Sequence, residues 1–126
     1  PVPALDSRLG NKDEVLGLVF PGSPREVLAI SAAYLSAHPL YHYSVGQVQL
    51  VVLTDRSGAS RVYESSGVEF AEFDRDATVI DKVGVRWRLG EDALVAADGR
   101  RFRRLPAHRA FWFGWYSAYN HTRLVN

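Results

Sequence analysis

Cysteine and methionine are both missing from this 126-residue sequence. Without cysteine the chain can form no disulfide bond, no thiolate metal site and no cysteine nucleophile. Because methionine is absent even at position 1, we expect that the natural start has been removed, along with any targeting segment that preceded Pro1. No apolar run approaches the roughly 20 residues that a membrane-spanning helix requires. We therefore expect no transmembrane segment in this chain.

Lysine is scarce and the overall charge is small. Only two of the fifteen cationic residues are lysines, and the formal net charge is +1. The charge is nevertheless unevenly distributed, with a net −5 over residues 64–81 and a net +5 over residues 82–109. A nucleic-acid-binding domain usually carries a basic excess as a whole, so we expect no nucleic-acid partner. The alternative is nucleic-acid binding through Arg100, Arg101, Arg103 and Arg104, with an affinity that falls steeply with salt.

No complete catalytic set can be identified in the sequence. The serines at positions 57, 65, 66 and 117 lie outside any nucleophile-elbow pattern, and glycine-rich phosphate loops are absent. His38 and His42 have the four-residue spacing of two metal ligands on one helical face, but Pro39 disfavours a helix there. The sequence therefore favours a protein that is not an enzyme, and we expect neither a metal nor another cofactor.

The length fits one domain, 1–126, which would bury roughly two-thirds of the surface that its unfolded chain exposes. Short apolar stretches alternate with turns rich in Gly, Pro and Asp, which is typical of antiparallel strands. Pro21-Gly22-Ser23-Pro24 predicts a hairpin turn, and Asp98-Gly99 predicts a two-residue turn with positive φ at both positions. We predict strands at residues 14–20, 25–30, 47–54, 61–63, 68–73, 79–81, 85–89 and 93–96. The predicted fold class is α+β, with mainly short antiparallel strands that form a compact sheet or a small barrel.

Two helices complete this prediction. The first is a short helix near 31–37, opened by Ser31 and closed before His38, because the residue that precedes Pro39 avoids the helical region. The second runs near 106–119, begins at Pro106, and holds six of the fifteen aromatic residues. Its rings could form part of the core, a docking surface for a partner or the wall of a cofactor site. We favour the core, because each such ring can bury about 150–250 Å².

Several short segments occur in an order that is typical of one family. They are Pro3-Ala4-Leu5-Asp6, Val15-Leu16-Gly17-Leu18, Val45-Gly46-Gln47, Arg104-Leu105-Pro106-Ala107-His108-Arg109-Ala110-Phe111-Trp112-Phe113 and Thr122-Arg123-Leu124-Val125. In these motifs the chain resembles the bacterial and archaeal domain-of-unknown-function family 3179 over nearly its whole length. The resemblance implies a shared scaffold but no particular reaction. Because members often carry export or lipoprotein signals, it also implies an extracytoplasmic location, either periplasmic or at the cell surface.

The chain departs from this family at its most polar motifs. Many members carry a Trp-His-Glu piece and a Cys-Pro-Leu-Cys-Gly turn. The family's histidine falls on His38, its tryptophan and glutamate fall on Ala37 and Pro39, and its two cysteines fall on Thr54 and Ser57. If the family's cysteines and histidine form a metal or redox site, this chain has lost the thiolates. The resemblance therefore implies a structural or binding role here.

These observations lead to two hypotheses of different classes. The first is an exported, non-catalytic accessory or binding module that serves a protein partner or a larger extracytoplasmic or membrane-associated complex. It rests on the arginines and tryptophans of the last third, which are residue types enriched at interface hot spots. The alternative is a metal- or ligand-binding enzyme domain that uses His38 with His42 or His108. A small-molecule ligand is left open. The candidate binding residues are His38, His42, Arg101, Arg103, Arg104, His108, Arg109, Trp112, Trp115 and Tyr116.

Overall fold

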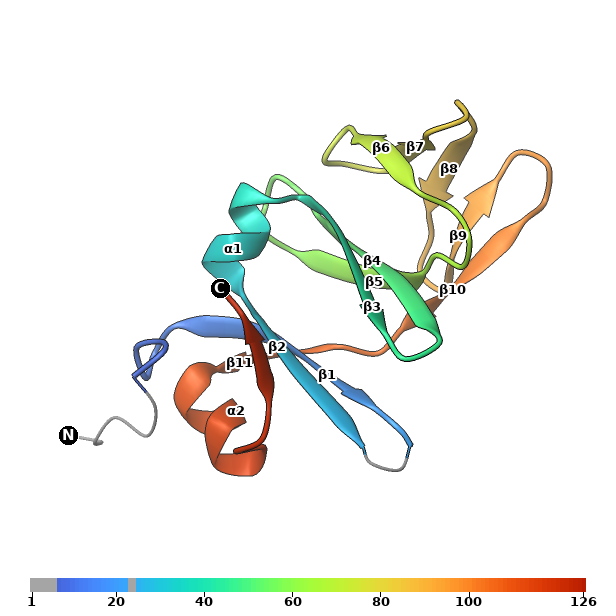
Figure 1. The fold of residues 1–126 in the computed structure, drawn as a ribbon. Helices are drawn as coiled ribbons and strands as arrows, with labels where there is room; N and C mark the ends of the chain where they lie inside the picture. The colour runs from blue at the N-terminus through green and yellow to red at the C-terminus, as the bar shows by residue number, and fades with distance from the viewer. Residues whose placement is uncertain (1–6, 23–24) are drawn as a thin grey trace. The chain divides into compact units, whose positions relative to one another are not determined.

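A computed structural model describes residues 7–22 and 25–126 (Figure 1). The chain divides into two compact units, Pro1–Tyr34 with Ala107–Asn126 and Leu35–Pro106, which are described separately. The motif Pro3-Ala4-Leu5-Asp6, and Ser23 and Pro24 of the predicted hairpin turn, lie outside the described residues. The organisation as one domain stays a prediction.

The first unit contains a small sheet that joins strands from the first and last parts of the sequence. In the described residues the strand order is β11-β1-β2-β12, with β1 antiparallel to β2 and β11, and β12 parallel to β2. The bounds are β1 Glu14–Phe20, β2 Glu26–Ser31, β11 His108–Phe111 and β12 Arg123–Val125. Strands β1 and β2 confirm two predicted strands and their hairpin, whereas the sequence does not predict β11 or β12.

The aromatic helix near the C-terminus is confirmed, but it is shorter than predicted. It is α2, Trp112–Ala118, and the residues before it form strand β11 instead of the first helical turns. The reason is tertiary, because β11 completes the edge of the sheet beside β1, from His108 opposite Gly17 to Phe111 opposite Glu14. Pairing along a sheet edge thus outweighs the helical pattern of this segment.

The two tryptophans of α2 form the core of the first unit. Trp112 is fully buried and Trp115 is 5% exposed, and both pack with Val15 and Ala29. The Trp115 ring lies directly over Gly17, where an added Cβ would come within 2.3 Å of the ring atom Cζ3. The core interpretation of these two rings is therefore confirmed.

The predicted short helix is α1, Ala32–Ala37. Ser31 Oγ accepts a hydrogen bond from the Tyr34 N–H at 3.0 Å, which is the N-cap contact that a serine provides at this position. The helix ends before His38 and Pro39, as the proline predicts. Within the described part of the chain, neither helix has the length and apolar character needed to cross a membrane.

The second unit is a nearly closed, eight-stranded, barrel-like sheet. Its strand order is β3-β4-β5-β10-β9-β8-β7-β6, and every neighbouring pair is antiparallel. The bounds are β3 Leu40–Val45, β4 Val48–Thr54, β5 Ser60–Glu64, β6 Phe70–Phe73, β7 Thr78–Asp81, β8 Arg86–Leu89, β9 Ala93–Ala96 and β10 Arg101–Leu105. Between the two edge strands, the Phe70 N–H of β6 donates to His42 Nε2 of β3 at 3.1 Å. The predicted α+β fold with a small barrel is confirmed, although the sequence does not predict β3 or β10.

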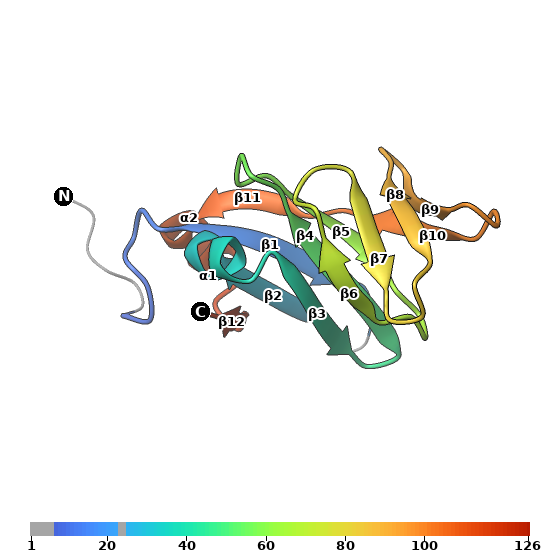
Figure 2. The same cartoon turned by 90° about the horizontal axis from the view of Figure 1, so that it is seen from above.

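Three hairpin turns of this barrel share one geometry. They connect β4 to β5, β7 to β8 and β9 to β10, and these strand pairs can be followed in Figure 2. Each turn is a three-residue loop that ends on a glycine with a φ of 90°, namely Gly58, Gly84 or Gly99. The prediction of a hairpin at Asp98-Gly99 is confirmed, but the predicted loop length of two residues is wrong. The Ala96 N–H donates to the Arg100 carbonyl across the loop, and of the two predicted positions only Gly99 has a positive φ. A tight turn followed by one left-handed residue needs glycine only at that last position.

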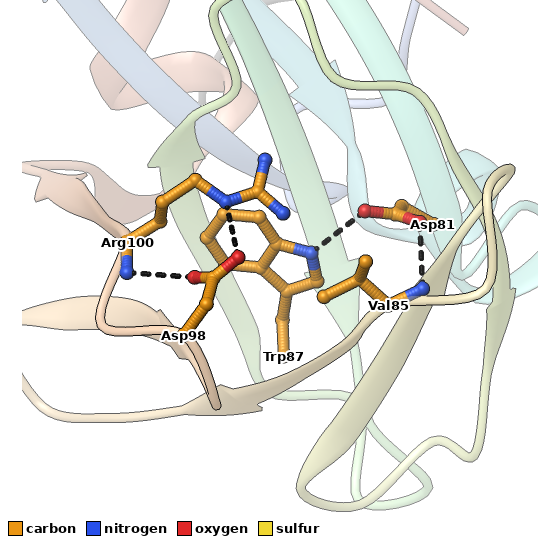
Figure 3. A network of polar contacts seen from close by, with 5 residues as sticks. All are labelled: Asp81, Val85, Trp87, Asp98 and Arg100. Carbon is orange, nitrogen blue, oxygen red and sulfur yellow. Dashed lines mark hydrogen bonds and ion pairs between the residues drawn. The ribbon is translucent and has the colours of Figure 1, made fainter.

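Trp87 lies at the centre of the barrel core and is fully buried. Its ring stacks on Phe102 with 4.8 Å between centroids, and the Arg100 guanidinium lies 4.9 Å from the ring centroid. Asp98 holds Arg100 in this position by accepting hydrogen bonds from its backbone N–H and from Nε (Figure 3). The cation and the two rings thus form a continuous stack.

Asp81 supports this core with a buried carboxylate. Its Oδ2 accepts the indole N–H of Trp87 at 3.0 Å, and its Oδ1 accepts the backbone N–H groups of Val83 and Val85. Burial raises the pKa of Asp81, but the hydrogen bonds lower it by a larger amount. The net effect is a pKa below the usual range. Asp81 therefore joins the β7–β8 turn to the barrel core in its ionised form.

Candidate functional site

A cavity of about 430 Å³, open to solvent, lies beside the edge strand β3 of the barrel, and most of the polar side chains that line it are exposed. In the β3–β4 register His42 is opposite Val51, which belongs to the barrel core, so His42 and Ser44 lie on the same face of the sheet as Val51, where both are exposed. The loop between β5 and β6 supplies the opposite wall. The residues with polar side chains that line the cavity are His42, Tyr43, Ser44, Gln49, Ser65 and Glu69.

His42 joins the two edges of the barrel at this cavity. Its Nε2 accepts the Phe70 N–H, and its ring stacks on the Phe70 ring with 6.1 Å between centroids. Because Nε2 is an acceptor, the neutral ring carries its proton on Nδ1. Partial burial lowers the pKa of His42, Glu69 opposes this shift and Lys82 adds to it. His42 is therefore mainly neutral at pH 7, and its one basic nitrogen is already engaged.

Gln49 holds the opposite wall in place. Its backbone carbonyl accepts a hydrogen bond from the Ser65 N–H at 3.0 Å, and its side-chain Oε1 accepts one from the Gly67 N–H at 2.8 Å. Gly67 has a φ of 74°, which closes the turn from Ser65 to Val68. Since these contacts use the oxygens of Gln49, its carboxamide N–H groups remain as donors at the cavity.

The charge at the cavity is compensated locally. Glu69 forms an ion pair with Lys82, and the hydrogen bond from Lys82 holds the pKa of Glu69 below its usual range. With His42 neutral and Glu69 paired, the lining carries hydroxyl, carboxamide and imidazole donors beside one neutralised carboxylate. Such a lining can form several hydrogen bonds with an uncharged ligand.

The histidines that the sequence singles out lie in different parts of the fold. His38 is exposed between α1 and β3, His42 lies on β3 at the cavity, and His108 is exposed on β11 of the other unit. Across residues 7–22 and 25–126, no three His, Asp or Glu side chains gather as a metal site requires. A metal on either nitrogen of His42 would also require breaking the bond from the Phe70 N–H. The role of these histidines in binding stays a prediction.

Thr54 and Ser57, which occupy the positions of the family's cysteines, are bound into the β4–β5 turn. The Thr54 and Ser60 hydroxyl groups are hydrogen-bonded at 2.8 Å, and the Ser57 hydroxyl donates to Asp55 Oδ1 at 2.6 Å. In this chain both hydroxyl groups therefore stabilise the turn.

Three of the four clustered arginines have local partners. Arg103 pairs with Glu64 at 2.7 Å, Arg104 donates to the Glu91 carbonyl at 3.2 Å, and Arg100 is held by Asp98. Arg101, the fourth, is exposed on β10. This run is therefore not the continuous row of available cations that the sequence suggests.

The remaining predicted residues belong to the first unit. Arg109 is exposed on β11, and Trp112 and Trp115 are buried. Tyr116 is half-buried, with its ring 5.4 Å from that of Trp112. The exposed rings of this region are instead Phe111, at 56%, and Phe113, at 37%.

Sequence reasoning finds His42 but misses the other residues at the cavity. Gln49 and Gly67 are eighteen residues apart and meet through their hydrogen bond, and Glu69 reaches the site through the loop before β6. The one local signal is Ser65-Ser66-Gly67, which predicts a turn but not its partner. Gln49 meets this turn through the pairing of β4 with β5, whereas the segment at Glu69 and Phe70 reaches His42 because the barrel nearly closes.

No curated protein and no solved structure matches this chain. The model of one family, described as a protein of unknown function (DUF3179), matches residues 1–122 of the chain. The chain therefore belongs to the DUF3179 family.

Proposed function

We propose that this chain is a non-catalytic binding module that takes a small, polar, uncharged ligand in the cavity beside His42. The observation that carries the proposal is the hydrogen bond from the Phe70 N–H to His42 Nε2. This bond uses the only basic nitrogen of the neutral imidazole, so His42 cannot accept a proton from a substrate while the bond exists. The residue best suited to acid–base chemistry thus serves the scaffold, and its Nδ1–H is left as a donor.

The ligand class follows from the chemistry of the lining. The donors are the Nδ1–H of His42, the carboxamide of Gln49 and the hydroxyls of Ser44 and Ser65, and the carboxylate is already neutralised by Lys82. A charged ligand would find no opposite charge free to pair with it. A ligand rich in hydroxyl groups satisfies such a mixture, because each hydroxyl both donates and accepts.

Amide chemical shifts of the isotope-labelled protein test this proposal. Glucose and glycerol serve as uncharged probes at millimolar concentration, and glutamate and inorganic phosphate serve as charged ones. We expect the uncharged probes to shift the amide signals of Gly67, Glu69 and Phe70, which lie at the cavity wall. If no probe moves these signals, the binding proposal fails. If only glutamate or phosphate moves them, the assignment of an uncharged ligand fails.

A matched pair of variants separates the cavity from the rest of the surface. Ser44→Leu fills the cavity from an exposed strand position, whereas Ser36→Leu places the same side chain on the exposed surface of α1. Binding should be lost in Ser44→Leu and kept in Ser36→Leu. Equal loss in both variants would mean that the shifts do not report the cavity.

We also propose that the module is exported and acts as an accessory subunit of a larger extracytoplasmic assembly. The export signals implied by its family support the location. The exposed rings of Phe111, at the end of the edge strand β11, and of Phe113, two residues later in α2, support the contact with a partner. Fractionation of cells that produce the full-length protein should find it outside the cytoplasm, in a particle heavier than the monomer. A cytoplasmic monomer would exclude this role.

A further inference from the structure

The outer face of the barrel carries three arginines close together, two on β8 and one on β10, the second strand along. Along β8, Arg86 and Arg88 alternate with the buried Trp87 and therefore point away from the core. Arg88 is opposite Val95 on β9, and Val95 is in turn opposite Arg101 on β10. Two strand spacings separate Arg88 from Arg101, or about 10 Å, and two residues separate Arg86 from Arg88, or about 7 Å. We call Arg86, Arg88 and Arg101 the arginine face.

None of these three cations is paired with an acidic side chain in the described part of the chain. Among the described residues none of them forms an ion pair or a side-chain hydrogen bond, unlike Arg100 and Arg103. Placing like charges close together costs free energy that a bound anion would offset. The arginine face is therefore complementary to a negatively charged partner.

The surface between the arginines is open and partly apolar. Thr78, Val95 and Ala97 line a groove of about 430 Å³ together with Arg86 and Arg88. An extended peptide that carries a carboxylate at every second residue repeats its charges at about 7 Å, which matches the spacing of Arg86 and Arg88. The planar guanidinium group also binds carboxylates through paired hydrogen bonds.

The surroundings favour an acidic peptide over a nucleic acid. Glu72 lies on the same outer face as Arg86, with Ile80 between them, so a long polyanion would meet a negative charge at this border. On β8 and β10, as the structure describes them, Trp87 is fully buried and the half-buried Phe102 ring stacks on it, so neither strand presents an exposed ring on which bases could stack. The arginine face is thus short, bounded and without exposed rings.

We propose that the arginine face docks a short acidic segment of a protein partner. The site is separate from the cavity beside His42, and the proposal does not depend on a ligand there.

Fluorescence anisotropy of a labelled peptide tests this docking. The probe alternates glutamate with glycine, and a second peptide carries glutamine in place of each glutamate. We expect the intact chain to bind the glutamate peptide, with an affinity that falls as salt is added, and not to bind the glutamine peptide. Each Arg→Gln change should weaken binding by up to about five-fold, as for an exposed ion pair, and the double variant Arg88→Gln/Arg101→Gln by about ten-fold or more.

Two controls make the result decisive. Arg123→Gln removes the same charge from β12, in the other sheet, and should leave binding unchanged. Oligothymidylate serves as the nucleic-acid probe. The proposal is overturned if the glutamate peptide does not bind, or if the double variant binds it as well as Arg123→Gln does. It is also overturned if oligothymidylate binds more tightly than the peptide through the same arginines.

Discussion

Two ionisable side chains in this protein accept hydrogen bonds from backbone N–H groups, in the place of backbone carbonyls. His42 Nε2 accepts the amide of Phe70 where two edge strands meet without a backbone ladder, and Asp81 accepts two amides of its own turn. A buried amide left without an acceptor costs about 1–3 kcal/mol. The protonation states of these residues should therefore be coupled to the stability of the barrel.

Acidification should weaken the fold through His42. Because the pKa of His42 is lowered in the folded state, the unfolded chain binds more protons as the pH falls below about 6.5. The contribution to the free energy of unfolding is fully present above that pH and is lost as the pH falls through the folded pKa. Urea titrations between pH 5 and pH 8 measure it. In His42→Gln, whose carboxamide oxygen can accept the same amide, this dependence should disappear.

The exposed His121 provides the control for this experiment. His121→Gln should keep the wild-type dependence on pH. Should His42→Gln lose stability on acidification as steeply as the wild type, the interpretation of His42 as the responsible group would be wrong.

Replacing Asp81 by asparagine should destabilise the protein by about 2–3 kcal/mol, the range for a buried hydrogen-bonded charge. One asparagine oxygen cannot serve the two turn amides and the Trp87 indole, and the new amide group would face a donor. Urea unfolding measures the effect. Asp76→Asn, at an exposed position in the turn between β6 and β7, should change stability by less than about 0.5 kcal/mol. Equal effects of the two changes would show that the Asp81 network is not stabilising.

At the scale of elements, the contact between α2 and β1 depends on a missing side chain. Gly17 leaves the space that the Trp115 ring fills, and the indole N–H of Trp115 donates to Thr122 Oγ1 at 3.0 Å. Thr122 in turn donates to the carbonyl of Arg123, at the start of β12. The ring thus ties a helix and two strands together.

Two glycine-to-alanine changes should have opposite effects. Gly17→Ala places a methyl group against the Trp115 ring and should cost about 1–3 kcal/mol through overpacking. Gly114→Ala lies within α2 with no atom within 4 Å of the new methyl group, and should stabilise by about 0.5–1 kcal/mol through helix propensity. Thermal unfolding measures both. If Gly17→Ala were as stable as Gly114→Ala, the close approach of the ring would be wrong.

Local patterns explain which elements the sequence predicts. Strands such as β1 and β4 are apolar stretches bounded by turn residues, so short windows suffice to identify them. In β10, arginines occupy three of five positions, and besides its hairpin partner β9 the strand pairs with β5, which lies far away in sequence. The candidate site follows the same rule. The sequence identifies His42 by its chemistry, but not Phe70, because their contact exists only where the barrel nearly closes.

At the scale of the whole molecule, the open question is whether the two units unfold together. Each contains a hydrogen-bonded indole N–H, that of Trp115 in the first unit and that of Trp87 in the barrel. The two indole signals are thus natural probes of the two units.

We expect both indole signals to disappear at the same urea concentration, as a single domain of this length requires. Proton–nitrogen spectra recorded through a urea titration measure the two midpoints without any substitution. Far-ultraviolet circular dichroism supplies the reference for the whole chain. Two separated midpoints would show that residues 1–126 form two domains.

Val83, at the tip of the β7–β8 turn, combines exposure with a fixed backbone. Its side chain is 85% exposed, while its N–H donates to Asp81 Oδ1 at 3.1 Å. Since the chain has no cysteine, Val83→Cys would introduce a single thiol, and a fluorophore attached there would move with the barrel. The turn therefore offers a fixed reference point from which distances to a docked peptide can be measured.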